Sequence, residues 1–234
     1  ENVRRVELET EQRKLYLAAV VDAREKLRAA KPEDKMTVFA VLMRLREICC
    51  DPRLVADNWT GSSAKLEACL ELVTEAVAGG HRILLFSQFT SMLELLAKRL
   101  DEAGVSHFTL QGSTPKPVRA EQVRRFNQGE ADVFLISLRA GGTGLNLTAA
   151  DIVIHYDPWW NLAAQNQATD RAYRIGQRNP VQVYRLIAQD TIEEKIVELQ
   201  QAKQSLADTV TGGADGAILS MNPEQLLQLL GEEA

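Results

Sequence analysis

The sequence predicts an α/β fold in which helices cover both faces of a parallel β-sheet. From Ser63 onward, helix-like and strand-like patterns alternate along the chain, which is typical of parallel strands joined by crossover helices. The expected strands are short apolar runs, such as residues 83–86 and 152–154, of the kind that a doubly covered sheet buries. Gly79-Gly80 and Gly104 follow expected helices, at the position where a helix commonly ends.

Residues 1–60 are predicted to form a helical extension ahead of this fold. A partial apolar stripe runs through residues 11–31 and ends at a proline. A second helix is expected over residues 35–50, because apolar side chains recur there at helical spacing and Asp51-Pro52 ends the pattern. Residues 58–63 are rich in turn formers and are expected to be a linker.

The central region, residues 61–190, is predicted to hold the sheet in a RecA-like arrangement, whose functional loops lie at the carboxyl ends of the strands. One of its helices is expected to begin with a capping box, because Ser91 is followed three residues later by Glu94. The other expected elements are, in order, a helix over 66–77, strands over 83–86 and 106–110, a helix from Pro117, strands over 133–137 and 152–156, a helix over 162–175 and a strand over 181–187.

The C-terminal region, residues 191–234, is predicted to be a helical brace on this lobe or on a partner lobe. Thr191 and Glu194 have the spacing of a capping box, and a polar helix is expected to follow to about Asp208. A glycine-rich link then leads to a final helix, which Asn222 caps and Pro223 begins.

Composition narrows the function classes. The chain has 234 residues, 45% of them hydrophobic and 25% charged, which is ordinary for a globular protein with a sizeable core. Its net charge of −5 argues against bulk attraction to nucleic acid but permits a local basic track. No apolar run has the length of a membrane span. Cys49, Cys50 and Cys69 have no metal-type spacing, so we expect reduced thiols in a cytosolic compartment and no metal site.

The residue pattern most suited to chemistry lies in the helix expected after Trp159-Trp160. Gln167, Arg171 and Arg174 stand at positions i, i+4 and i+7, so they share one polar face of that helix. Such a face can simply be solvated. Two guanidiniums one turn apart, just beyond a strand end, are also suited to meeting an anion, and we expect both to be offered outward.

Small and polar residues also follow several expected strands. Hydroxyl groups and glycine amides grip phosphates without reading base sequence, although any one such loop is a weak signal. The loops contain Ser87-Gln88, Gly112-Ser113-Thr114 and the stretch from Ser137 to Asn146.

These loops, in this order, together with the string Q-A-T-D-R-A-Y-R-I-G-Q at residues 167–177, resemble the later motifs of superfamily-two helicases. The form is similar to that of the Swi/Snf family of DNA-translocating ATPases. The resemblance implies a C-terminal RecA-like motor lobe whose Arg171 and Arg174 reach the phosphates of ATP across a cleft. It implies nucleotide contacts by Gly142, Gly144, Asn146 and Gln167. It also implies contacts with the backbone of double-stranded DNA by Ser87, Gln88, Gly112, Ser113, Thr114, Ser137, Arg139 and Trp160.

The resemblance has one departure that bears on geometry. Gln165 stands where an acidic side chain is usual in the family, and we expect this change to weaken an orienting contact near the nucleotide.

The first half of an ATP site is absent from the sequence. No G-x-x-x-x-G-K-[ST] phosphate loop and no D-E-x-H box occurs in the chain. We therefore expect an N-terminal RecA-like lobe of the same polypeptide, ahead of Glu1, to bind most of ATP and Mg²⁺. The isolated chain is expected to bind no cofactor and to hydrolyse no ATP. The motor is expected to be monomeric and to act in the bacterial cytoplasm at the nucleoid, or in the nucleus of a eukaryote.

Other readings remain open at this point. The chain could be a RecA-like binding or regulatory module that has lost its motor, or a lobe of an RNA helicase from the same superfamily. A small-molecule enzyme is disfavoured, because the three histidines and the Cys49-Cys50 pair have no catalytic spacing. His155 lies in an expected strand and is interpreted as a packed or edge histidine.

Overall fold

A computed structural model describes residues 1–138, 140, 145–172, 180–207 and 220–231. The chain divides into two compact units, and each is discontinuous in sequence. The first unit comprises Glu1–Arg5, Leu66–Trp159 and Ala163–Ile187, and the second comprises Val6–Lys65, Trp160–Leu162 and Ala188–Ala234. The expected central lobe thus falls largely in the first unit, whereas the helical extension and the C-terminal brace fall together in the second.

The sheet has six strands in the order β1-β6-β5-β2-β4-β3. The pairs β2/β4, β2/β5, β3/β4 and β5/β6 are parallel, as the sequence predicted for a RecA-like lobe. The register places Ser87 of β2 opposite Ser137 of β4. The strands are β1 (Asn2–Val6), β2 (Ile83–Ser87), β3 (His107–Leu110), β4 (Val133–Ser137), β5 (Ile152–His155) and β6 (Gln182–Ala188).

Strand β1 corrects the prediction that the chain begins as a helical extension. Residues Asn2–Val6 form a strand at the edge of the sheet, beside β6. Its side chains are exposed or half-buried, and the strand carries Arg4 and Arg5. Natural sheets protect their edges with short, charged strands of this kind, which carry little of the apolar pattern that sequence analysis detects.

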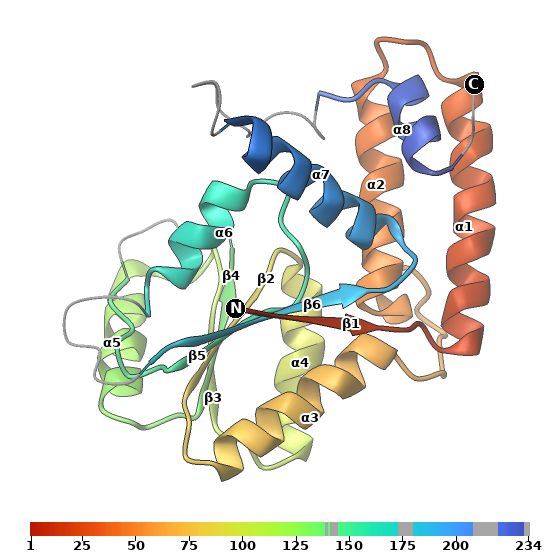
Figure 1. Cartoon of the computed structure of the whole chain (residues 1–234). Helices are drawn as coiled ribbons and strands as arrows, with labels where there is room; N and C mark the ends of the chain where they lie inside the picture. The colour runs from red at the N-terminus through yellow and green to blue at the C-terminus, as the bar shows by residue number, and fades with distance from the viewer. Residues whose placement is uncertain (139, 141–144, 173–179, 208–219, 232–234) are drawn as a thin grey trace. The chain divides into compact units, whose positions relative to one another are not determined.

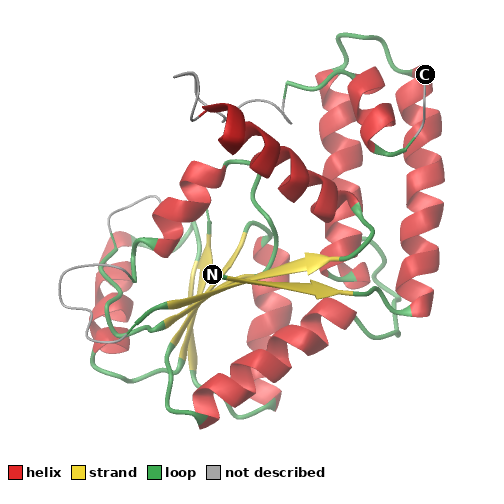
Figure 2. Ribbon diagram, viewed as in Figure 1, coloured by secondary structure: helices red, strands yellow, loops and turns green. Residues whose placement is uncertain are grey.

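Helices cover the sheet on both faces (Figures 1 and 2). On one face, Phe126 of α5 (Lys116–Asn127) and Ala168 of α6 (Leu162–Thr169) join a core with Leu84, Phe86 and further strand residues. Helices α3 (Ala64–Ala78) and α4 (Thr90–Glu102) lie on the other side of the strands. This arrangement confirms the predicted fold class and explains why the central strands are apolar throughout.

The start of α4 differs from the predicted capping box. Helix α4 begins at Thr90, with Phe89 as its N-cap and no side-chain cap hydrogen bond, so Ser91 lies inside the helix. The amide groups ahead of the helix are satisfied from elsewhere. The amide of Phe89 donates to the Ser87 hydroxyl at 3.2 Å, and the amide of Gln88 donates to Asp157 at 3.3 Å. A carboxylate distant in sequence therefore fixes the turn that leads into the helix.

Helix α6 is shorter than predicted. It ends at Thr169 rather than near residue 175, and Asp170, Arg171 and Ala172 form a turn. Ala168 and Ala172 both join the apolar core beneath the helix. The amides of Arg171 and Ala172 donate to the carbonyls three residues earlier, at 3.3 and 3.1 Å, so the chain tightens into a turn where the sequence predicted a further helical turn.

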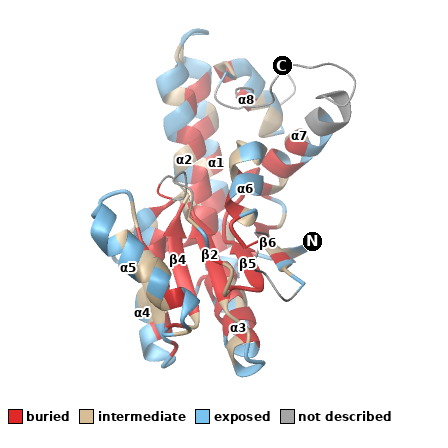
Figure 3. Cartoon of the chain, turned by 90° about the vertical axis from the view of Figure 1, so that its left-hand side faces the viewer, coloured by how far each residue is buried: buried red, intermediate tan, exposed pale blue. Residues whose placement is uncertain are grey.

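The second unit has its own apolar core, built from helices at both ends of the chain (Figure 3). It contains α1 (Thr10–Ala29), α2 (Lys35–Cys50), a 3₁₀ turn (Pro52–Leu54), α7 (Ile192–Ala207) and α8 (Pro223–Leu229). Asn222 and Gln225 form a capping box at the start of α8, with Pro223 in the first turn, so the predicted helix start is confirmed. No helix in the described ranges is long and apolar enough to cross a bilayer.

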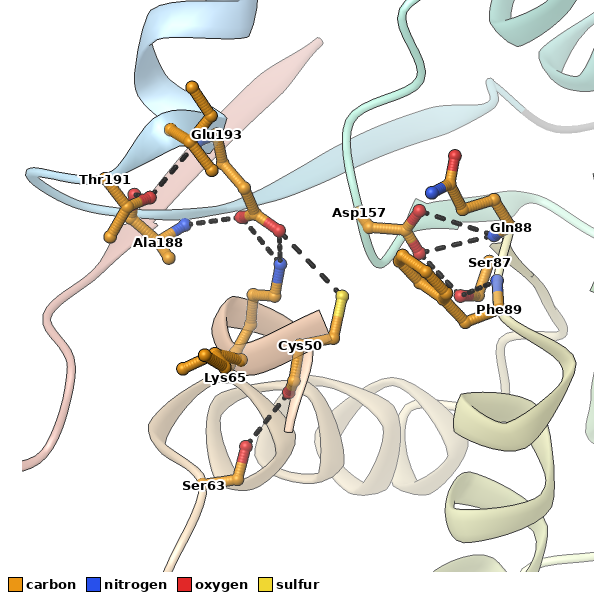
Figure 4. A network of polar contacts seen from close by, with 12 residues as sticks. Cys50, Ser63, Lys65, Ser87, Gln88, Phe89, Asp157, Ala188, Thr191 and Glu193 are labelled. Carbon is orange, nitrogen blue, oxygen red and sulfur yellow. Dashed lines mark hydrogen bonds and ion pairs between the residues drawn. The ribbon is translucent and has the colours of Figure 1, made fainter. Parts of the chain in front are cut away.

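A buried ion pair also holds the second unit together (Figure 4). The Nζ atom of Lys65 lies 2.6 and 2.7 Å from the two carboxylate oxygens of Glu193, and both side chains are fully buried. Glu193 also accepts a hydrogen bond from the amide of Ala188 at 2.8 Å. The pair therefore fastens the first turn of α3 to the first turn of α7.

Candidate functional site

The residues that follow four neighbouring strands gather at one edge of the sheet. Because β5, β2, β4 and β3 are parallel and adjacent, their carboxyl ends point the same way. Asp157, Gln88, Ser137 and the loop 111–114 therefore lie along this edge, in the order of their strands. The register brings together the predicted DNA-contacting residues from three separate loops.

At the end of β2, a buried carboxylate organises the turn into α4 (Figure 4). The Ser87 hydroxyl donates to Oδ1 of Asp157 at 2.5 Å, and the Gln88 amide lies 3.3 and 3.4 Å from the two Asp157 oxygens. Ser87 and Asp157 are both fully buried. Sequence analysis placed Asp157 only in a strand-breaking turn, since its partner is 70 residues away along the chain.

This burial changes the part that two predicted residues can play. Ser87 points inward to Asp157, and Ser137 opposite it is also buried. Neither side chain faces solvent, and the predicted contact of Ser87 and Ser137 with a DNA backbone stays a prediction. The half-buried Gln88 is the residue at this strand end that can reach outward.

The loop 111–114 after β3 is the most open part of this edge. Gly112 and Ser113 are exposed, and Thr114 is half-buried. The Thr114 hydroxyl accepts the amide of Gln111 at 3.0 Å, and the Thr114 amide donates to the carbonyl of Gln111 at 3.1 Å. A Cβ atom built on Gly112 would meet no atom of the described chain within 4 Å.

The predicted nucleotide residues that the structure describes lie near the turn after α6. The amide of Leu147 donates to the carbonyl of Arg171 at 3.3 Å, which joins the segment containing Asn146 to this turn. Asn127, at the end of α5, holds the same segment, donating to the Asn146 carbonyl at 2.8 Å. The side chains of Asn146 and Gln167 are exposed.

Arg171 departs from the expectation that it is offered outward on a helical face. It lies in the turn beyond α6, and its side chain is enclosed, with only 2% of the residue exposed. Arg139, Gly142, Gly144 and Arg174, which complete the predicted site, lie outside the described residues.

Helix α6 is attached to the sheet and to the tryptophan turn by neutral polar groups. Nε2 of His155, in β5, lies 2.8 Å from the Thr169 hydroxyl, which itself donates to the carbonyl of Gln165 at 3.3 Å. The Thr169 hydroxyl thus links the β5 histidine to the helix. Burial, with a smaller effect of the nearby Arg185 charge, lowers the pKa of His155 to about 3, so the ring is neutral.

Gln165 retains an orienting contact in place of the acidic residue usual in the family. It is buried, and its side-chain oxygen accepts the amide of Trp159 at 3.1 Å. A carbonyl oxygen is a weaker acceptor than a carboxylate but reaches the same kind of donor.

Trp160 lies in the second unit and packs against α2. The guanidinium carbon of Arg46 lies 4.3 Å from its ring centroid, and Phe39 lies 6.1 Å away, centroid to centroid. The indole is half-buried, and these contacts account for much of its surface. Its predicted contact with DNA stays a prediction.

Acidic, histidine and cysteine side chains do not gather into a metal-binding group of three or more anywhere in the described ranges. All three cysteines are buried thiols. Burial raises the pKa of Cys49, and the nearby Glu193 carboxylate adds to this effect, so the thiol is protonated and unreactive at neutral pH.

Comparison with known proteins identifies what the chain is similar to. Residues 64–176 match the family described as "Helicase conserved C-terminal domain". The chain is 37% identical over 96% of its length to an uncharacterized ATP-dependent helicase of Mycoplasma pneumoniae, and covers 22% of that protein. It is 37% identical over 85% of its length to the SWI/SNF-related regulator of chromatin subfamily A member 1 of Mus musculus, and covers 20% of it. The chain thus spans about a fifth of these relatives.

Solved structures give the same result. The C-terminal domain of the Sulfolobus solfataricus SWI2/SNF2 ATPase is similar with a TM-score of 0.81 and 27% identity, covering 100% of this chain and 98% of that one. The ATPase core from the same organism in complex with dsDNA is similar with a TM-score of 0.82 and 28% identity, covering 100% of this chain and 50% of that one.

Proposed function

Because this chain is the C-terminal lobe of an ATP-dependent helicase of the SWI/SNF-related family, we propose that it serves as one half of a motor that moves along double-stranded DNA. The observation that carries the proposal is that one lobe holds two separate sets of predicted site residues. One group surrounds the turn at Arg171, and the other follows the carboxyl ends of β2 and β3.

On the nucleotide side, Arg171 and Arg174 act as arginine fingers toward the phosphates of ATP. Asn146 and Gln167, with Gly142 and Gly144, lie near the same nucleotide. Guanidinium groups suit this role because charge spreads over the γ-phosphate oxygens during transfer. Arg171 is enclosed in the structure, so its guanidinium has to become accessible when a nucleotide-bearing lobe docks.

On the DNA side, Gln88, Gly112, Ser113, Thr114 and Arg139 hold the phosphate backbone of one strand. These groups read no base edge, so their contacts are equivalent at every step along the duplex. Ser87 and Ser137 support this surface from beneath, because both are buried.

The remaining ATP contacts, including the phosphate loop and the carboxylates for Mg²⁺, come in this proposal from an N-terminal RecA-like lobe. Nucleotide binding closes the cleft between the lobes, and hydrolysis removes the bridge that the arginines make. The alternation shifts one lobe relative to the other along the DNA. In a bacterium the site of action is the nucleoid, and in a eukaryote it is the nucleus.

The test is ATP turnover in the full-length protein that carries this lobe. Arg171→Ala and Arg174→Ala are each expected to lower kcat roughly a hundredfold or more in the presence of duplex DNA. Arg124→Ala is the matched control, because Arg124 is an exposed arginine paired with Glu121 on α5. Unchanged DNA affinity in the two test variants would show that the lobe is still folded.

Two outcomes would contradict the proposal. Full ATP turnover in both arginine variants would leave a regulatory module that does not take part in hydrolysis. Stimulation of turnover by RNA rather than by duplex DNA would identify the lobe as part of an RNA helicase instead.

A further inference from the structure

We infer that Arg119 is a positioning residue that fixes the loop 111–114 in the conformation that receives a DNA phosphate. The inference rests on the proposed function of this lobe, and it assigns to Arg119 a role that acts through the loop rather than on the DNA itself.

Arg119, in the first turn of α5, bonds to the loop that precedes its helix. Its Nε donates to the carbonyl of Thr114 at 2.7 Å, and its Nη2 donates to the carbonyls of Gly112 at 2.8 Å and Gln111 at 3.2 Å. Three carbonyls of a four-residue loop thus converge on one guanidinium. Hydrogen bonds from a charged donor are among the stronger ones in proteins, so this contact dominates the loop.

The hydrogen bonds to Arg119 determine which polar groups of the loop remain available to a ligand. Its carbonyls turn toward Arg119, and the amides of Gln111 and Thr114 are used within the loop. Across the described ranges, no hydrogen bond is made by the amides of Gly112 and Ser113. Two consecutive amides and the exposed Ser113 hydroxyl therefore remain as donors for an anion, an arrangement that suits a phosphate group.

Gly112 leaves room for a ligand beside these two amides. Its backbone is not in the left-handed region, and a Cβ atom on it would meet nothing within 4 Å. Neither backbone conformation nor packing within the described chain explains a glycine at this position. The absence of a side chain lets the backbone of another molecule approach the loop closely.

Lysine cannot replace Arg119 in this role. A guanidinium is planar and presents its donors in a fixed fork, whereas an ammonium is a single point of charge on a flexible stem. Arg119 is half-buried and its charge is directed at carbonyl oxygens. Its effect on DNA binding should therefore depend on fork geometry and not on charge alone.

The experiment compares Arg119→Lys and Arg119→Ala with Arg124→Ala in the full-length protein, using a duplex oligonucleotide of fixed length. Arg124 is the matched control, because its loss removes one positive charge from the same helix, and its guanidinium bonds to the nearby Glu121 and Gln128 rather than to the loop. The readouts are the apparent Kd for duplex DNA, its dependence on salt, and kcat at saturating DNA.

We expect both Arg119 variants to raise the Kd for DNA roughly tenfold, because the loop loses its internal bonds and must be ordered on binding. The salt dependence should keep its slope, and kcat at saturating DNA should stay within twofold of the unmodified protein. Arg124→Ala should leave the Kd within about twofold.

The inference is wrong if Arg119→Lys binds DNA as tightly as the unmodified protein, since charge alone would then suffice. It is also wrong if Arg119→Ala lowers the slope of log K against log salt by about one, which is the effect of losing a direct phosphate contact. A full-length protein that does not bind duplex DNA would instead refute the proposed function.

Discussion

At the scale of single residues, His155 shows how burial fixes a protonation state. Its ring lies in a central strand, stacks on Phe86 at 5.5 Å, and shares a hydrogen bond with the Thr169 hydroxyl through Nε2. The pKa of about 3 in the folded protein lies below the ordinary value of 6.5, so the unfolded chain takes up a proton that the folded chain refuses. Stability from this group is complete above pH 6.5 and falls as the pH drops toward 3.

This linkage predicts a pH-dependent effect of His155→Gln, which keeps a donor for Thr169 but does not titrate. Each pH unit below 6.5 costs the unmodified chain about 1.4 kcal/mol. The stability advantage of the unmodified chain over the variant should therefore fall by roughly 2 kcal/mol between pH 7 and pH 5. Urea unfolding of both chains at the two pH values measures it. Parallel pH profiles would show that folding leaves the pKa of His155 unchanged.

Ser87 allows a second test at this scale. The predicted role was contact with DNA, whereas the structure directs the hydroxyl to the buried Asp157 carboxylate. Ser87→Ala should lower the free energy of unfolding by about 1–3 kcal/mol, because Asp157 loses a hydrogen bond in a buried setting. Ser113→Ala, at an exposed serine of the same sheet edge, should change it by less than about 0.5 kcal/mol. Equal stability of the two variants in urea would contradict the structural role of Ser87.

At the scale of elements, the Lys65–Glu193 pair joins the starts of α3 and α7 with two fully buried charges. Removing one partner leaves the other charge buried and uncompensated, so Lys65→Met should cost about 3–5 kcal/mol. The double variant Lys65→Met with Glu193→Leu should be more stable than Lys65→Met alone, since no buried charge remains.

The exposed Lys26–Asp22 pair on α1 provides the control for this experiment. Its two side chains are about half exposed, at 55% and 51%, and water screens their attraction. Lys26→Met should change stability by less than about 1 kcal/mol. If thermal or chemical unfolding showed the two single lysine variants to be equally stable, the buried pair would not fasten the elements as described.

The helices and strands differ in how well the sequence predicts where they begin and end. Helix α2 and strands β2, β4 and β5 were predicted within a residue or two, because apolar periodicity and prolines or glycines mark them. The start of α4 was not, since Phe89 stands at its N-cap and the turn ahead of it bonds to Asp157, 69 residues away in sequence. The end of α6 at Thr169 was missed because no proline or glycine marks it in the sequence.

The candidate site likewise has features that the sequence reveals and features that only the folded structure reveals. The loops at the strand ends could be found because small and polar residues there depart from the apolar pattern around them. Arg119 could not be singled out, because its three bonds go to main-chain carbonyls whose positions depend on the folded loop. Asp157 likewise could not be singled out, because it meets Ser87 only when β5 lies beside β2.

At the scale of the whole molecule, the buried cysteines report on both units. Cys49 and Cys50 belong to the second unit and Cys69 to the first, and all three are fully buried. The folded chain should therefore take up no iodoacetamide at pH 8 during a short pulse, and the unfolded chain should take up three equivalents. Mass spectrometry of peptides across a urea series would show whether Cys49-Cys50 and Cys69 become reactive together. Rapid labelling without denaturant would contradict the burial.

The second unit has a consequence for synthesis on the ribosome. Helices α1 and α2 are made early, yet Ala188, Ile192 and Leu226, which complete their core, come from the far end of the chain. At ordinary translation speeds of about 5–20 residues per second, the early hairpin waits on the order of ten seconds or more for them. During that interval the apolar faces of Leu42, Leu45 and Ile48 are uncovered, so the nascent chain should be a client for chaperones that bind hydrophobic segments near the exit tunnel.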